Sequence, residues 1–285
     1  MPAVDNKKPR VSVPMYRIVP ALFVALVAWG QALADTYAFS APPGPDAGES
    51  RSLYAPLMDL LSRETGESFL YVHPESRLAY LRDMRAGRFQ LLLDDAHFAS
   101  WRITVQEHVP LVTTRESITF VAIATKDGRI YSREDLVGRP VCARAPPDLG
   151  TLGFLEQFHG PFRVPQILPV PDHLDRVQRL LTGRCAGAVL ARHQYTGSSE
   201  IRGVAARLKI IAQTDSYPGL TLTADPRLPE RLRATVRNIL LSRSGGAATR
   251  ALRDRYAGGG NFVEANPDNY EGLHEMLRDY PGFER

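Results

Sequence analysis

The sequence is poor in cysteine: 285 residues include only two, Cys142 and Cys185. Two cysteines cannot form the framework of a small disulfide-rich scaffold, and neither has the spacing of a zinc ligand or a redox motif. Each lies in a short apolar run, "PVCA" and "CAGAVLA". In an oxidising compartment such a pair is expected to form a disulfide, which would stabilise the fold by about 4 kcal/mol. Two buried free thiols are the alternative.

The common catalytic motifs are also missing. There is no Gly-x-Ser-x-Gly sequence, no phosphate-binding P-loop and no His-Glu-x-x-His helix. No carboxylates are paired at a spacing that indicates acid–base chemistry. The sequence therefore predicts a protein that is not an enzyme and has no cofactor.

Charge of one sign is not in excess. The chain has 35 Lys and Arg against 31 Asp and Glu, and residues 1–34 contain four of the basic residues and one of the acids. The remaining chain is close to neutral, with 31 basic and 30 acidic residues. A nucleic-acid-binding surface needs a clear basic excess, so none is expected.

Long hydrophobic runs are absent except near the N-terminus. There, Lys7, Lys8, Arg10 and Arg17 accompany the run "IVPALFVALVAW", and "ALA" follows at 32–34. This order is typical of a cleavable signal peptide, and it predicts residues 1–34 as the leader and Asp35 as the mature N-terminus. The alternative is an uncleaved membrane anchor, for which the run is short. We expect an exported, periplasmic protein.

Hydrophobic periodicity predicts alternating strands and helices after the leader. Strands are expected at 36–43, 68–74 and 89–95, with helices at 52–66 and 77–88 between them. This βαβαβ order indicates an α/β fold with a mainly parallel sheet covered by helices. A second such unit begins near 133, with a helix at 173–183 and a strand from 185, and residues 229–285 are expected to be mostly helical.

Two β-rich segments interrupt the alternation, at 109–125 and at 207–226. We interpret them as crossings, one leaving a first lobe and one returning to it. The predicted lobes are 35–122 with 213–285, and 123–212. Loops at the carboxyl ends of parallel strands would then face a cleft, where small-molecule sites concentrate.

This arrangement resembles the periplasmic solute-binding proteins of ABC transporters, in particular the phosphate/phosphonate-binding group. The matching segments are "YAPLMDLLSRETG", "LRDMRAGRFQLLLDDAHF", "YSREDLVGRPVCA", "PDLGTLGFL" and "RLLTGRCAGAVLA". The resemblance implies a two-lobed type 2 binding-protein fold with a two-strand hinge. It also implies a monomer that binds a small, anionic ligand in the cleft and delivers it to an ABC permease.

The same resemblance implies an anion site where a helix begins after "PPDLG". Gly150, Thr151 and Leu152 occupy the positions at which phosphonate binders offer several hydroxyl groups, so only one hydroxyl remains. Backbone N–H groups and the helix dipole would still favour an anion there. Leu220 follows the Pro-Gly of the return crossing, where such binders have an acid.

Polar and aromatic residues at expected strand ends and crossings complete the candidate contacts. Asp95 and its neighbour Asp94 could equally be a helix cap, and the tyrosines could equally be core residues. The candidates are Ser40, Tyr54, Asp95, His97, Asp172, His173, His193 and Tyr217.

Two other functions stay open. His97, His173 and His193 could converge with Asp94 or Asp95 on a metal ion, because imidazole and carboxylate groups are common ligands. Alternatively, the protein could report its ligand state to a membrane receptor rather than to a permease.

Overall fold

The computed structural model describes residues 1–3, 35–44, 46–160 and 163–283. The predicted signal peptide and its cleavage site therefore lie almost entirely outside the described residues. The described residues from 35 to 283 belong to one compact unit. Within the described residues, no helix has the length and apolar character that a bilayer span requires.

The first sheet has six strands in the order β11-β4-β10-β3-β1-β2. Four strands run in one direction, whereas β10 and β11 are reversed. The strands are β1 (Thr36–Ser40), β2 (Ser68–Tyr71), β3 (Leu91–Asp94), β4 (Val109–Thr114), β10 (Thr221–Ala224) and β11 (Phe262–Glu264). We call this sheet with its helices the first lobe.

The second sheet has five strands in the order β7-β6-β8-β5-β9, and only β5 is reversed. The strands are β5 (Phe120–Thr125), β6 (Pro140–Ala143), β7 (Gln166–Pro169), β8 (Gly187–Ala191) and β9 (Leu208–Gln213). This sheet and its helices form the second lobe. The chain passes between the lobes at 115–119 and 214–220, and these crossings pair where Ile118 and Tyr217 exchange two backbone hydrogen bonds of 2.9 Å.

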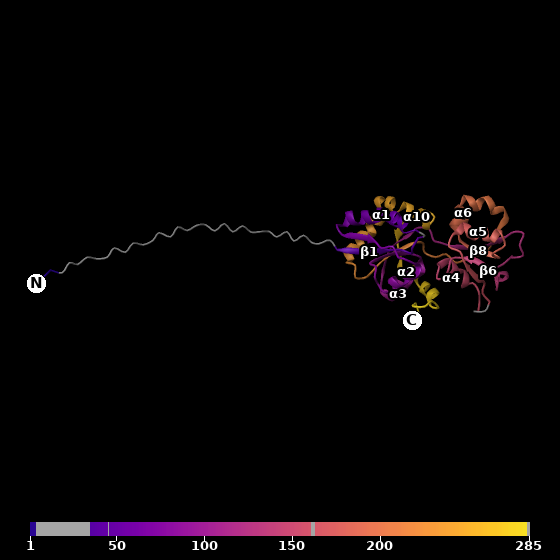
Figure 1. Cartoon of the computed structure of the whole chain (residues 1–285), viewed down its shortest axis with the longest axis horizontal. Helices are drawn as coiled ribbons and strands as arrows, with labels where there is room; N and C mark the ends of the chain where they lie inside the picture. The colour runs from indigo at the N-terminus through magenta and orange to yellow at the C-terminus, as the bar shows by residue number, and fades with distance from the viewer. Residues whose placement is uncertain (4–34, 45, 161–162, 284–285) are drawn as a thin grey trace. The chain divides into compact units, whose positions relative to one another are not determined.

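Helices cover both faces of the first sheet. Figure 1 shows α1 and α10 on one side of β1 and α2 and α3 on the other. Asp46 caps α1 by accepting from the Glu49 N–H at 2.7 Å, and Gly66 ends that helix with φ at 80°. The helices are α1 (Ala47–Thr65), α2 (Arg77–Arg85), α3 (Ala96–Gln106), α8 (Glu230–Leu241), α9 (Arg243–Ala248) and α10 (Arg250–Tyr256).

The side chains of the first sheet alternate between two cores, as a strand period of two requires. Leu91 and Leu93 pack in a core with α1, α8 and α10, whereas Leu92 packs with α2 and α3 on the opposite face. A fully buried leucine of this kind contributes about 1.5–3 kcal/mol. The alternation explains why "LLLD" is apolar throughout: β3 is covered on both faces.

The second lobe repeats this alternation. Val121 and Ile123 of β5 face one core, and Ala122 and Ala124 face the other. Figure 1 includes α4, α5 and α6 beside β6 and β8. The helices are α4 (Leu149–Leu155), α5 (His173–Leu181), α6 (Arg192–Gly197) and α7 (Ser199–Val204).

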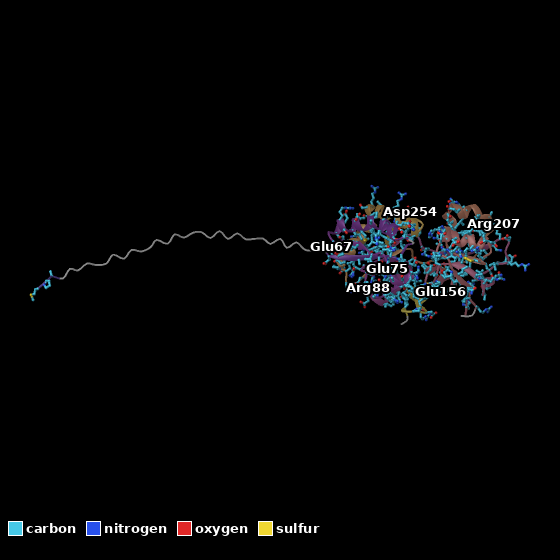
Figure 2. The ribbon with its side chains drawn as sticks, in the orientation of Figure 1. Glu67, Glu75, Arg88, Glu156, Arg207 and Asp254 are labelled. Atoms are coloured by element: carbon cyan, nitrogen blue, oxygen red, sulfur yellow. A yellow bond between two sulfur atoms is a disulfide. The ribbon has the colours of Figure 1, made fainter. Side chains whose placement is uncertain are left out.

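The predicted disulfide is present, and it is drawn in yellow in Figure 2. It joins Cys142 in β6 to Cys185, which lies two residues before β8. The parallel pairing of β6 with β8 brings the two α-carbons to 5.8 Å, within the range of disulfides. The bond therefore links a strand to the turn that leads into its neighbour.

Two local features differ in detail from the expectations. The strand expected from residue 185 begins at Gly187 and ends at Ala191, and α6 follows directly. Residues 262–264 form strand β11 in a region expected to be mostly helical. The predicted lobe boundary at 122 falls inside β5, and the exact limits of the lobes stay a prediction.

Candidate functional site

A cavity of about 280 Å³ lies where both crossings meet the two lobes. Its wall contains carboxylates, hydroxyl groups, an arginine and a histidine. The lining residues are Asp95, Thr114, Glu116, Ser117, Ile118, Thr119, Arg192, His193, Thr196, Gly219, Leu220, Tyr256, Ala257 and Gly258.

The topology explains why these residues meet. Asp95 follows the carboxyl end of β3, and Arg192 follows the carboxyl end of β8. The outward crossing supplies residues 116–119, and the return crossing supplies 219–220. Ligands of open α/β sheets bind beyond the carboxyl ends of strands, so the cavity occupies the position that the fold favours.

Asp95 is an acid that lines the cavity and whose pKa the fold raises. Burial, followed by the negative charge of Asp148, raises its pKa to about 6. Its side chain does not cap α3, although the backbone is at the N-cap position. Asp95 therefore presents a carboxylate to the cavity, and near pH 6 this group gains or loses a proton.

The neighbouring Asp94 has a different role. Its two carboxylate oxygens accept from Arg102 at 2.7 and 2.8 Å, and the Tyr80 hydroxyl also donates to it. Both members of the ion pair are fully buried. Asp94 consequently holds α3 against β3 and does not line the cavity.

The second lobe contributes the basic groups. Arg192 donates to the Gln213 side-chain oxygen at 2.5 Å, and its own side chain is exposed. Burial, together with the charge of nearby His173, lowers the pKa of His193, so its ring is neutral at pH 7. The cavity thus has acids from the first lobe and the outward crossing on one side and an arginine from the second lobe on the other.

The cavity wall contains a buried hydroxyl group and two closely packed glycines. The Thr114 hydroxyl is buried and has no hydrogen-bond partner among the described residues. A β-carbon on Gly219 would lie 1.9 Å from that oxygen, and one on Gly258 would lie 3.0 Å from the His193 β-carbon. Any larger residue at Gly219 would displace Thr114, so this glycine is needed for close approach of the return crossing.

Of the predicted contacts, the structure brings Asp95 and His193 together at the cavity. Ser40 is buried and donates to the Val72 carbonyl at 2.9 Å. Tyr54 packs in the first core against Tyr71, with ring centroids 4.4 Å apart. These contacts are with the protein's own residues.

The other predicted contacts also have partners within the chain. Asp172 caps α5, accepting at 2.9 Å from the backbone, and its carboxylate lies 3.7 Å from His173. Tyr217 is buried beside α4, where a β-carbon on Gly153 would meet its hydroxyl. A ligand role for these residues stays a prediction.

Asp148 caps the N-terminus of α4, where the anion site was predicted. The Thr151 N–H donates to Asp148 at 3.2 Å, and the Thr151 hydroxyl donates to the Arg144 carbonyl at 2.7 Å. Gly150 faces the Phe120 ring, and Leu152 packs against the first lobe. The N–H and hydroxyl of Thr151 thus have partners within the chain, and none of the three predicted residues lines the cavity. A ligand role for Gly150, Thr151 and Leu152 stays a prediction.

The metal alternative has no geometric support in the part of the chain that the structure describes. No three His, Cys, Asp or Glu residues lie there in an arrangement that could hold a metal ion. His97 is fully buried, and its Nε2 lies 3.0 Å from the Pro147 carbonyl. His173 and His193 lie on α5 and α6 of the second lobe.

Most of the cavity wall was not identified from the sequence. Glu116, Thr119 and Arg192 lie in segments interpreted as strands, and Tyr256 and Gly258 lie in the C-terminal region. The order "YAGGG" at 256–260 was a detectable signal, because consecutive glycines allow a close backbone approach. Gly258, Gly259 and Gly260 all have positive φ.

A comparison with known protein families identifies the family of the chain. The family model described as "ABC transporter, phosphonate, periplasmic substrate-binding protein" matches residues 39–270. A search of curated protein sequences gives no match.

Several solved structures share the fold. A Xanthomonas citri protein bound to ATP has 13% identity and a TM-score of 0.71, covering 88% of this chain and 97% of its own. The methylphosphonate complex of PhnD1 from Prochlorococcus marinus has 12% identity and a TM-score of 0.65, with coverages of 86% and 97%. A binding protein of a Pseudomonas aeruginosa ABC phosphonate transporter has 15% identity and a TM-score of 0.63, covering 85% of each chain.

Proposed function

Because the chain belongs to the periplasmic substrate-binding family of ABC phosphonate transporters, we propose that it captures a small polar solute in the cavity and delivers it to an ABC permease. The observation that carries the proposal is the polar cavity at the meeting point of both lobes and both crossings. Family membership and the methylphosphonate bound by a protein of the same fold favour a phosphonate-like or other oxyanion group on the ligand.

The charges of the cavity wall refine the ligand class. Arg192 is the guanidinium available to an anionic group, with Thr119 and Thr196 as nearby hydroxyl donors. Asp95 and Glu116 would repel a ligand that is anionic throughout. The ligand that fits best therefore carries an anionic group together with a cationic or hydrogen-bond-donating group.

Calorimetric titration tests this function. Methylphosphonate, aminomethylphosphonate and inorganic phosphate are added to the purified protein at pH 7.5. We expect aminomethylphosphonate to bind more tightly than methylphosphonate, because its ammonium group can face the acids. Binding should also raise the melting temperature by mass action. If none of the three binds, the proposed ligand class is wrong.

A matched pair of arginine variants tests the position of the site. Arg192→Ala should weaken anion binding by about tenfold, the effect of losing one charge-assisted hydrogen bond. Arg184→Ala is the control, because Arg184 is also exposed on the second lobe but does not line the cavity. Equal affinities of the two variants would place the anion elsewhere.

The proposal also includes the cellular location of the protein and its partner. We expect a monomer in the periplasm, exported by a leader that ends at residue 34 and without enzymatic activity. If the protein instead serves a membrane receptor, deleting it should abolish a ligand response without abolishing ligand uptake.

A further inference from the structure

The backbone carbonyl of Pro147 joins the two lobes. It belongs to the loop between β6 and α4 in the second lobe, and it accepts two hydrogen bonds from the first lobe. Arg77 at the start of α2 donates through Nη2 at 3.1 Å, and His97 in the first turn of α3 lies at 3.0 Å through Nε2. Both lone pairs of this oxygen are therefore used by side chains of the other lobe.

The protonation state of His97 makes it a donor in this contact. Burial lowers the pKa of His97 to about 4, so the ring is neutral at pH 7. A carbonyl can only accept, so the single ring proton is on Nε2 and Nδ1 is the unprotonated nitrogen. His97 Nδ1 and Arg77 Nε are both buried without a hydrogen-bond partner among the described residues. Both side chains thus donate a hydrogen bond to the Pro147 carbonyl, although each keeps one buried nitrogen that has no partner among the described residues.

An apolar contact lies on the same segment. Leu152, five residues after Pro147, packs into a core of the first lobe with Tyr80, Leu92 and Phe98. Its side chain is only 6% exposed. The loop and the first turns of α4 are therefore fixed to the first lobe by both hydrogen bonds and apolar burial.

We propose that Arg77 and His97 are positioning residues that hold the lobes closed through the Pro147 carbonyl, also when no ligand is bound. In the described chain from residue 35 onward, the backbone passes between the lobes only at the crossings 115–119 and 214–220. Separation of the lobes about these crossings breaks both hydrogen bonds and exposes Leu152. The contact shifts the equilibrium toward the closed state, and a ligand that needs this state then binds more tightly.

Distances between the lobes of the unliganded protein test this proposal without any assumption about the ligand. Spin labels are attached to Arg63→Cys on α1 and Gln178→Cys on α5, two exposed positions on different lobes. We expect one short-distance population. With Arg77→Met and His97→Phe together, the ratio of closed to open molecules should fall by at least tenfold, since each lost hydrogen bond is worth about fivefold.

Two controls separate this role from general stability. Arg82→Met removes an exposed arginine of the same helix whose side chain donates hydrogen bonds to its neighbour Asp83, and it should leave the distances unchanged. His97→Gln keeps an amide N–H at the reach of Nε2 and should restore the closed population. Arg77→Met alone, at a position that is only partly buried, is the variant most certain to fold.

The dissociation rate of methylphosphonate is the second measurement, and it rests on the proposed function. It should rise by about tenfold in the double variant and stay unchanged in Arg82→Met. If methylphosphonate, aminomethylphosphonate and phosphate all fail to bind the wild type, only the proposed function fails, because the spin-label distances still decide on the contact. An unliganded wild type that is mainly open, or a double variant with unchanged distances, would overturn the inference.

Discussion

Replacing Asp95 with asparagine should stabilise the protein at neutral pH. The fold raises the pKa of Asp95 from 3.8 to about 6, chiefly by burial. A shift of about two units corresponds to about 3 kcal/mol of destabilisation when the group is ionised. Because the side chain is partly exposed, solvent screening reduces the expected gain of Asp95→Asn to about 1–2 kcal/mol.

The stability gained by Asp95→Asn is expected to increase with pH. Below about pH 4 the carboxyl is protonated in both the folded and the unfolded chain, so it imposes no penalty. As the pH rises from 4 to 6, the unfolded chain releases the proton first, and the native state loses stability. Above pH 6 the penalty is complete. The advantage of Asp95→Asn should therefore be small near pH 4 and fully present at pH 7.5.

Urea unfolding at pH 4.5, 6 and 7.5 measures this difference, because other titrating groups affect the wild type and the variant alike. Asp127→Asn, at an exposed turn of the second lobe, is the control and should show no such trend. Equal stabilities of the wild type and Asp95→Asn at pH 7.5 would refute the claim that the ionised Asp95 carboxylate destabilises the fold. Removing the charge should also tighten methylphosphonate binding at pH 7.5 by several fold.

Three further outcomes are expected. Arg102→Met leaves the Asp94 carboxylate buried without its cation, and urea unfolding should show a loss of about 3–5 kcal/mol. Replacing Cys142 and Cys185 by alanine opens a loop of 43 residues and should cost about 4 kcal/mol, measured in the same way. N-terminal sequencing of the exported protein should begin at Asp35, and a full-length membrane-bound chain would contradict the predicted leader.

The sequence predicted the parts of the fold that follow from regular hydrophobic patterns. The alternation of helices and strands, the crossings and the disulfide can each be predicted from short segments of the sequence or from a pair of such segments. The structure contains all of these features. Helix α3 gave no such signal, because its first seven residues are all buried, the polar ones among them included. A helical segment that is buried on every side, such as residues 96–102, lacks the periodicity by which amphipathic helices are identified.

The candidate site was less predictable, because it depends on contacts between distant segments. Asp95 and His193 were identified from their positions after strands, whereas Glu116 and Gly258 were not. The latter pair reach the cavity through the outward crossing and through a glycine-rich turn after α10. Their approach depends on how the C-terminal region packs, and no local pattern encodes that packing.

The loop "PPDLGTLG" illustrates why one pattern allowed two interpretations. An aspartate before a helix can be its cap, and the same helix N-terminus can bind an external anion. Here Asp148 accepts from the Thr151 N–H and lies 3.6 Å from Arg144. The Asp148 carboxylate thus caps the helix N-terminus at which a ligand anion was predicted, and that anion site stays a prediction. This self-capping leaves the loop free to contact the first lobe through Pro147 and Leu152, while the polar cavity lies at the crossings.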